Sequence, residues 1–393
     1  MSTTRLSISV HSKRLKTDRL EAGPTRAPGC TPSRRNLLRA GAAGVLLPSA
    51  VSFGRPTGAR ERTDRTLVLL HLSGGNDGLN TIVPYADPLY HELRPRLSSV
   101  APYVLAIDGR WGFHPALAGL ARLFDQGRLA VVHGVGHPAP DYSHVGSCHM
   151  WATGNGAAGA DRGWWDDVVE RVAPVAGRPV VCVGRPPVAT MVSPRLCRIA
   201  GGLTSPRRGP VAYRPGAIAA TLATAARVIL SPQPPPIVLA TVGGFDTHED
   251  QLARHATVLR ELGDGLAEFH HELEVRGAAD RVVLMAWSEF GRRPAENATG
   301  GTDHGSAGPV LLLGRPVRGG LYATPPSLHA TDFGNLIPTV DFRIVYQGLA
   351  RWLGCREGTS RDLDPLPAAE TCQSPPWSSG TVSAYSPETR IWA

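Results

Sequence analysis

Six short, almost uninterrupted apolar runs recur along the chain and restrict what it can fold into. The first, Thr66 to Leu72, reads TLVLLHL and leads into Ser73-Gly74-Gly75. The others are Leu129 to His133, Val180 to Val183, Ile237 to Val242, Val282 to Trp287 and Val310 to Leu313. Apolar residues without alternation are typical of strands covered on both faces, as in parallel sheets.

Segments with helical periodicity lie between these runs. In residues 249–275 apolar side chains recur at helical spacing, and residues 115–126 and 340–353 show shorter patterns of the same kind. Such a stripe predicts a helix that packs against a sheet. Strands alternating with helices predict an α/β fold, with a mainly parallel sheet sandwiched between helices. In such folds ligands bind beyond the carboxyl ends of the strands.

Composition divides the 393 residues into a leader, a body and a tail. The body is predicted over residues 64–355. Within it, residues 184–235 are rich in Pro, Arg and Gly, and we interpret them as an insertion or cap-like excursion. Residues 356–393 are rich in Pro and Ser and predict an irregular C-terminal tail.

Residues 1–50 have the order of an export signal. Arg34 and Arg35 precede a short apolar run and then Pro48-Ser49-Ala50, as in a twin-arginine signal cleaved near Ala50. The run is too short for a hydrocarbon core of ~30 Å, so no stable membrane span is expected. We therefore expect export by the twin-arginine translocase to the periplasm or the exterior; the alternative is a basic disordered tail.

The charge distribution excludes several functions. The net charge is +8, but residues 1–50 contain nine Lys or Arg and two acidic residues, so most of it belongs to the leader. The body is close to neutral, and no nucleic-acid partner is expected. Lys13 and Lys16 are the only lysines. The body therefore has no amine for a Schiff base and none for a phosphate-binding Walker loop.

The six cysteines contain no CxxC pair, which excludes a zinc knuckle and a thioredoxin motif. Outside the cytoplasm, Cys182 with Cys197 or Cys355 with Cys372 could form disulfides. Scattered buried thiols are the alternative.

Polar residues follow the apolar runs, at strand ends that are predicted to meet. Five segments supply them: Asn76-Asp77, Ser143-His144, Asp246-Thr247-His248, Glu289-Phe290-Gly291-Arg292 and Asp303-His304. Asp246 and His248 are two positions apart, so in extended backbone both point to one side and can share a metal ion. Carboxylate and imidazole together suit zinc or manganese, as one or two divalent ions.

Ser143 precedes a predicted short helix, Val145 to Thr153. The positive end of a helix favours an anion or an alkoxide, and a nearby metal ion would lower the pKa of the hydroxyl, which makes Ser143 a candidate nucleophile. Arg292 could offer a two-pronged guanidinium to phosphate or sulfate oxygens. The structural alternatives are an N-cap role for Ser143 and pairing of Arg292 with a buried Glu289.

The motifs GGNDGLN, SH, GFDTH, SEFGRR, GTDHG and VDFRIVY occur in that order over roughly residues 64–355. This order resembles the bacterial domain-of-unknown-function 1501 family, which is grouped with the alkaline-phosphatase-like superfamily. The resemblance implies a site with two metal ions and a serine or threonine nucleophile between them.

Carried over by motif order, the resemblance implies a role for six residues. Asp77 resembles the early metal-binding aspartate and Ser143 the nucleophile. Asp246 and His248 resemble the Asp and His that bind the first metal, and His304 resembles the late histidine. Glu289 stands where an Asp-His pair is expected, but Phe290 follows it. His144, Asp303 or Asn76 could take the place of the missing histidine, or a single ion could bind; Asp77 could also be a turn former.

These observations favour an exported, metal-dependent hydrolase of phosphate or sulfate esters with a serine nucleophile, acting on a small-molecule ester. The alternative is a non-catalytic exported binding or assembly protein on a degenerate hydrolase scaffold, since fold does not imply function. A metal-free serine hydrolase built on Ser143 is a third interpretation, but no Gly-x-Ser-x-Gly elbow occurs there.

Overall fold

The computed structural model describes residues 64–154, 162–172, 179–184, 191–193, 195–200 and 211–355. All of them belong to one compact unit. The predicted signal at residues 1–50 and the predicted tail at residues 356–393 lie outside the described residues, as do Cys30 and Cys372.

The core of the unit is a mixed, mostly parallel sheet. Strand β1 (Thr66–Leu72) lies between β8 (Ile237–Val242) and β9 (Val282–Trp287) and is parallel to both, with Leu69 paired to Leu239 and Met285. The strand order is β11-β5-β10-β9-β1-β8-β6-β7, and β14 pairs with β5. The remaining strands are β5 (Leu129–Gly136), β6 (Val180–Val183), β7 (Cys197–Ile199), β10 (Gly308–Leu313), β11 (Gly320–Tyr322) and β14 (Val340–Asp341). Only β10 is antiparallel to its neighbours in this sheet among the described strands.

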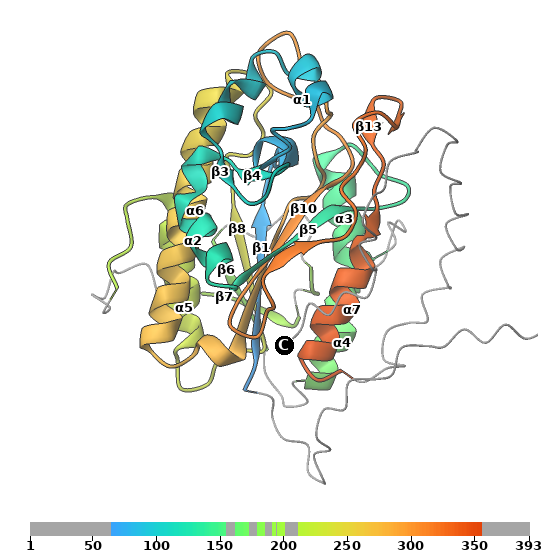
Figure 1. Ribbon diagram of the computed structural model, residues 1–393. Coiled ribbons are helices and arrows are strands. Elements are labelled where there is room, and N and C mark those ends of the chain that lie inside the picture. Colours follow the sequence, from blue (N-terminus) through green and yellow to red (C-terminus); the bar gives the residue numbers. More distant parts are fainter. Residues whose placement is uncertain are drawn as a thin grey trace, which may run out of the picture. The chain divides into compact units, whose positions relative to one another are not determined.

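Helices cover both faces of the sheet (Figure 1). One face carries α2 (Ala118–Asp125), α5 (Ala217–Ile229) and α6 (Gln251–Val275). The other carries α3 (His144–Thr153), α4 (Trp164–Val172) and α7 (Phe342–Trp352). Along β1, Val68 and Leu70 pack toward the first set and Leu67 and Leu69 toward the second, because successive strand side chains point to opposite faces. The predicted α/β sandwich with a mainly parallel sheet is confirmed.

Smaller elements connect the layers. They are η1 (Gly78–Asn80), β2 (Ile82–Val83), α1 (Pro88–Leu93), η2 (Leu97–Tyr103), β3 (Leu105–Ala106), β4 (Gly112–Phe113), η3 (Pro115–Leu117), η4 (Ala279–Arg281), β12 (Thr331–Asp332) and β13 (Asn335–Leu336). Of the described helices, none combines the length and the apolar character needed to cross a membrane.

The described part of residues 184–235 differs from the expected cap-like excursion. It supplies β7 at the sheet edge and α5, which packs against α6 and β8. A disulfide joins Cys182 of β6 to Cys197 of β7, one of the two pairings considered. Cys148 and Cys355 are buried free thiols. The Pro, Arg and Gly content of this segment suggested an excursion, but composition does not show which apolar residues pack on the sheet.

Candidate metal centre

The site lies at the carboxyl edge of the sheet. Because β1, β8 and β9 are adjacent and parallel, the residues that follow them meet there. Glycines permit the close approach. Gly74 has a φ of +124°, and a Cβ on it would lie 2.3 Å from the Asp246 nitrogen. A Cβ on Gly301 would lie 2.2 Å from the His248 carbonyl carbon. The loops after β1, β8 and β9 therefore need glycine in order to touch.

Three imidazoles converge on the carboxylate of Asp246. The Nε2 atoms of His248 and His304 lie 3.0 and 3.4 Å from Asp246 Oδ1, and the Nε2 of His144 lies 3.5 Å from Oδ2. The two Nε2 atoms of His248 and His304 are 2.9 Å apart. We call His144, Asp246, His248 and His304 the imidazole cluster. Ligand atoms of His144, Asp246 and His304 all lie within 4.8 Å of one another, as a metal site requires.

Two of the three imidazoles hydrogen-bond an acceptor through their outer nitrogen. His144 Nδ1 donates to Glu289 Oε1 at 2.8 Å, and His304 Nδ1 donates to the carbonyl oxygen of Tyr142 at 2.7 Å. His248 Nδ1 lies 3.6 Å from Asp303 Oδ1. A proton held at Nδ1 leaves a lone pair on Nε2, toward the centre of the cluster. Metal-ligating histidines are oriented in this way by carboxylates and carbonyls behind them.

The local charges set the protonation of three groups at the centre. Burial and the nearby Arg292 lower the pKa of His304, so this ring is neutral at pH 7. Partial burial raises the pKa of Asp246, but the hydrogen bond and charge of Arg292 outweigh it and hold that pKa below its ordinary value. The hydrogen bond to Glu289 raises the pKa of His144, which places its proton within reach of Asp246. A divalent cation would compete with that proton for the same lone pairs.

Arg292 does not present a free guanidinium. It is buried and donates to the carbonyl oxygens of Gly74, Gly75 and Thr302 and to Asp246 Oδ1 at 2.5 Å. The expected role in binding phosphate or sulfate oxygens is therefore corrected, because its donors are already occupied. Arg292 instead fixes the Asp246 carboxylate, and the alternative pairing with Glu289 is also wrong.

Glu289 lies behind the imidazole cluster and does not face its centre. Its buried carboxylate accepts from His144 through Oε1 and from His71 Nε2 through Oε2, the latter at 2.9 Å. The Gly74 nitrogen also donates to Oε1. Burial raises the pKa of Glu289, but the hydrogen bonds from His144 and His71 outweigh it and keep the carboxylate ionised. Metal ligation by Glu289 therefore stays a prediction, and the hydrogen bond at its Oε1 orients the His144 ring.

Asp77 belongs to a different, fully buried network. Its Oδ2 accepts from Arg94 Nη1 at 2.6 Å and from Gln251 Nε2. Gln251 Oε1 in turn accepts from Thr247, next to His248, and from Thr302, two positions before His304. Metal ligation by Asp77 stays a prediction, and in the structure Arg94 pairs with its Oδ2. Asp77 supports the two loops that carry the imidazoles.

Ser143 is the N-cap of α3. Its Oγ accepts from the Gly146 N–H at 3.0 Å, which confirms the N-cap alternative, and the side chain is exposed. Both of its sequence neighbours hold the imidazole cluster, Tyr142 through its carbonyl oxygen and His144 through its ring. The serine is therefore next to the cluster without being hydrogen-bonded to it.

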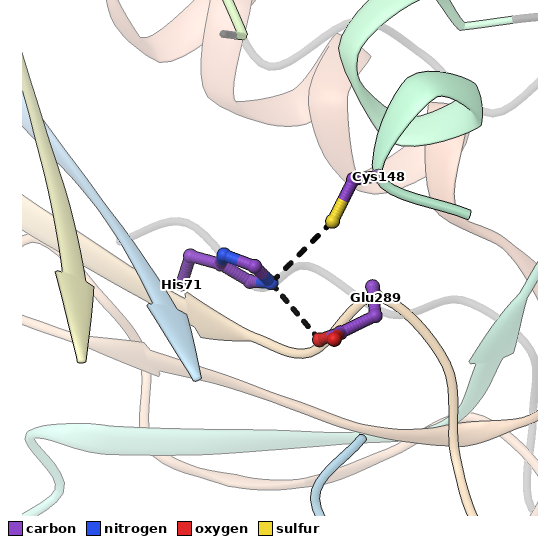
Figure 2. A group of neighbouring side chains, drawn as sticks. All are labelled: His71, Cys148 and Glu289. Atoms are coloured by element: carbon purple, nitrogen blue, oxygen red, sulfur yellow. Dashed lines mark hydrogen bonds and ion pairs between the residues drawn. The ribbon is translucent and has the colours of Figure 1, made fainter. Parts of the chain in front are cut away.

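Two buried residues, His71 and Cys148, were missed. His71 Nε2 lies 4.0 Å from Cys148 Sγ and 2.9 Å from Glu289 Oε2, so the three side chains point toward one another (Figure 2). His71 is the one polar side chain between Val68 and Leu72 in the first apolar run, which was the available signal. Nothing in the sequence distinguishes Cys148 from a core cysteine.

Comparison with known proteins supports the motif resemblance. A family model described as protein of unknown function (DUF1501) matches residues 214–335, which include Asp246, His248, Glu289, Arg292 and His304. The predicted resemblance is therefore confirmed over that range. No curated protein sequence matches the chain.

Solved structures of alkaline-phosphatase-superfamily sulfatases and phosphoesterases are similar to this chain in fold. The lipoteichoic acid synthase LtaP from Listeria monocytogenes shares 10% identity over 64% of this chain and 66% of that one, with a TM-score of 0.37. The C-terminal periplasmic domain of EcEptC from Escherichia coli, a zinc complex, shares 12% identity over 65% and 74%, with a TM-score of 0.38. A putative sulfatase from Bacteroides thetaiotaomicron shares 9% identity over 75% and 72%, with a TM-score of 0.41. Similarity this distant says nothing about function, which depends on the residues of the site.

Proposed function

We propose that this protein is an exported, metal-dependent hydrolase of phosphate or sulfate esters, with Ser143 as its nucleophile. The observation that carries the proposal is the orientation of three imidazoles. His144, His248 and His304 each have an acceptor near Nδ1, and their Nε2 atoms meet at Asp246. Without a cation or a proton between them, the lone pairs of His248 and His304 would repel at 2.9 Å.

The donor set fits a divalent ion that accepts nitrogen and oxygen ligands. The imidazoles of His144 and His304 with the Asp246 carboxylate match zinc, and manganese accepts the same set less readily. When bound, such an ion supplies Lewis acidity toward an ester oxygen and lowers the pKa of a nearby hydroxyl. The protein contributes orientation: Glu289 and the Tyr142 carbonyl fix two imidazole rings, and Arg292 fixes Asp246.

Ser143 has the hydrogen bonding expected of a nucleophile, and its neighbour in the chain, His144, belongs to the imidazole cluster. Its Oγ accepts the Gly146 N–H, so the hydroxyl hydrogen remains available for transfer. The N-terminus of the ten-residue α3 stabilises negative charge on that oxygen. Attack on phosphorus or sulfur would release the alcohol of the ester and leave a serine ester, which water then hydrolyses.

Export is proposed from the arginine pair and apolar run of residues 33–50, together with the Cys182–Cys197 disulfide. Disulfides persist in oxidising compartments and are rare in the cytosol, so this bridge favours a periplasmic or extracellular location.

A measurement of bound metal and turnover on one preparation tests the proposal. The purified protein is analysed for zinc and manganese and assayed with aryl phosphate monoesters, aryl phosphate diesters and aryl sulfates. We expect turnover that chelators abolish, that zinc or manganese restores, and that Ser143→Asn removes although asparagine still caps α3. Turnover that survives chelation or the loss of the Ser143 hydroxyl would contradict this function.

The alternative, a non-catalytic binding or assembly protein, is favoured by two contacts of Arg292. Arg292 Nη2 donates to Asp246 Oδ1, and Nη1 lies 3.3 Å from His248 Nε2, so a fixed positive charge already stands beside the candidate ligands. Stoichiometric metal without hydrolysis of any of the three ester classes would support this alternative.

A further inference from the structure

A second group of possible metal ligands lies deeper in the fold than the imidazole cluster. We propose that His71, Cys148 and Glu289 form a buried, thiolate-containing site for a zinc-type divalent cation. We call these three residues the buried triad (Figure 2). The proposal does not depend on ester hydrolysis by the imidazole cluster.

The buried triad is assembled from three separate elements. His71 belongs to β1, Cys148 to α3, and Glu289 follows β9. One ligand atom of each lies within 4.8 Å of the other two. His71 Nε2 is 2.9 Å from Glu289 Oε2 and 4.0 Å from Cys148 Sγ. A tetrahedral zinc ion holds neighbouring N, O and S ligands about 3.3–3.6 Å apart, so small adjustments would bring all three into its coordination sphere.

Burial and charge favour a cation at this place. Each of the three residues is only 3% exposed. As ligands of a divalent cation, Glu289 and Cys148 would each carry one negative charge, because a coordinating thiol is deprotonated. A divalent cation balances both charges, which makes the occupied buried triad neutral and reduces the cost of burying it. Soft thiolate with imidazole and carboxylate selects zinc over magnesium or calcium.

The surroundings hold the ligands in place. The His71 ring stacks on Trp287, with 4.5 Å between the ring centroids. Trp151 also stacks on Trp287, at the same centroid distance. Trp151 Nε1 donates to the Glu289 carbonyl oxygen at 3.0 Å. Rigid aromatic packing of this kind restricts the rotamers of a ligand and excludes water.

A cysteine–histidine–carboxylate nucleophile relay does not explain this arrangement. In a relay the imidazole contacts the thiol through one nitrogen and the carboxylate through the other. Here both contacts are made by Nε2, while His71 Nδ1 is buried without a hydrogen-bond partner. Two acceptors around one nitrogen fit a shared cation better than proton transfer along a chain.

Glu289 joins the two sites. Its Oε1 accepts from His144 of the imidazole cluster, and its Oε2 faces His71. An ion in the buried triad would therefore share the Glu289 carboxylate with His144 of the imidazole cluster. Cobalt(II) can distinguish the two, because the buried triad contains a sulfur ligand and the imidazole cluster contains none.

The test uses the full chain with its disulfide intact and with Cys30, Cys355 and Cys372 replaced by serine. Since Cys182 and Cys197 are bridged, Cys148 is then the only thiol. Loading with cobalt(II) should produce a near-ultraviolet sulfur-to-cobalt charge-transfer band, which zinc abolishes by competition. In the otherwise natural chain the band should disappear in Cys148→Ser and persist in the matched control Cys355→Ser.

His304→Ala separates this proposal from the proposed function. It should remove the ion of the imidazole cluster and leave the sulfur-to-cobalt band intact. If Cys148→Ser fails to fold, the single-thiol chain still decides the matter. A folded single-thiol chain without the band, or a band that persists in folded Cys148→Ser, would overturn the buried triad as a metal site, whatever the outcome of the ester assays.

Discussion

His248 and His304 face each other through their Nε2 atoms at 2.9 Å, although they are 56 positions apart in the sequence. The Tyr142 carbonyl fixes the His304 proton on Nδ1, so its lone pair points at the neighbouring ring. The contact is a hydrogen bond when His248 carries a proton on Nε2, and it is repulsive when two lone pairs face each other unless a cation lies between them.

The first prediction concerns this pair. Because a metal ion binds the folded state, zinc at 100 times its Kd should stabilise the protein by about 2.7 kcal/mol. His304→Ala should lose the gain from the imidazole cluster and keep any gain from the buried triad, whereas His329→Ala, which changes an exposed loop histidine, should keep both. Thermal unfolding with and without zinc measures the difference, and equal gains in both variants would refute a metal-binding role for His304.

Arg292 should be a stability residue as well as a site residue. Arg292→Met leaves the carbonyl oxygens of Gly74, Gly75 and Thr302 without their donor and Asp246 without its buried partner. We expect a loss of at least about 3 kcal/mol in the free energy of unfolding. The neighbouring, exposed Arg293→Met is the matched control and should change it by less than about 0.5 kcal/mol. Denaturant titration compares them.

Asp77 should behave as an ion-pair partner and not as a metal ligand. Asp77→Asn leaves the buried Arg94 charge without a counter-charge, which should cost about 3–5 kcal/mol of stability. The bound metal per folded chain should not change. Elemental analysis of the folded fraction checks this, and loss of one ion equivalent would restore Asp77 as a ligand.

The two roles of Ser143 can be separated. Ser143→Ala removes both the cap of α3 and the hydroxyl, and should cost about 1 kcal/mol of stability. Ser143→Asn keeps a capping oxygen, so its stability should stay near that of the natural chain. Both variants should lack ester turnover. A stable Ser143→Asn protein with full turnover would leave Ser143 with the capping role alone.

Stability should fall as the pH drops below about 6.5, and His133 should contribute to this. Burial lowers the pKa of His133 to about 4, opposed by the charge of Asp108, and burial lowers the pKa of His114 to about 4 and of His255 to about 3. Between pH 4 and 6.5 the unfolded chain therefore binds more protons than the folded one, and each such histidine costs up to about 3 kcal/mol as the pH falls.

His133→Leu should flatten this dependence. Because leucine removes the titrating group, the free energy of unfolding should fall less steeply from pH 6.5 to 4.5. His91→Leu, at an exposed position, should keep the original slope. Urea titrations at several pH values give both slopes, and an unchanged slope in His133→Leu would contradict the assignment.

Much of the architecture could be predicted from local patterns. Uninterrupted apolar runs such as Thr66 to Leu72 mark strands buried on both faces, and helical spacing in residues 249–275 marks α6. The strand-end positions of Asp246, His248 and His304 followed from the same reasoning, because parallel strands end at one edge. These predictions depend only on neighbouring residues, which is why the sequence by itself determined them.

Only the tertiary structure decided which charges meet. Arg94 had no sequence signal, yet it occupies the Asp77 carboxylate; Arg292 is used by backbone carbonyls; and Glu289 turns away from Asp246 to bind His144 and His71. In each case the partner comes from a segment brought close by folding, and a buried charge takes the nearest compensating group whatever its distance along the chain. Residue type and spacing predicted a polar site, whereas the packing of distant loops assigned each side chain its partner.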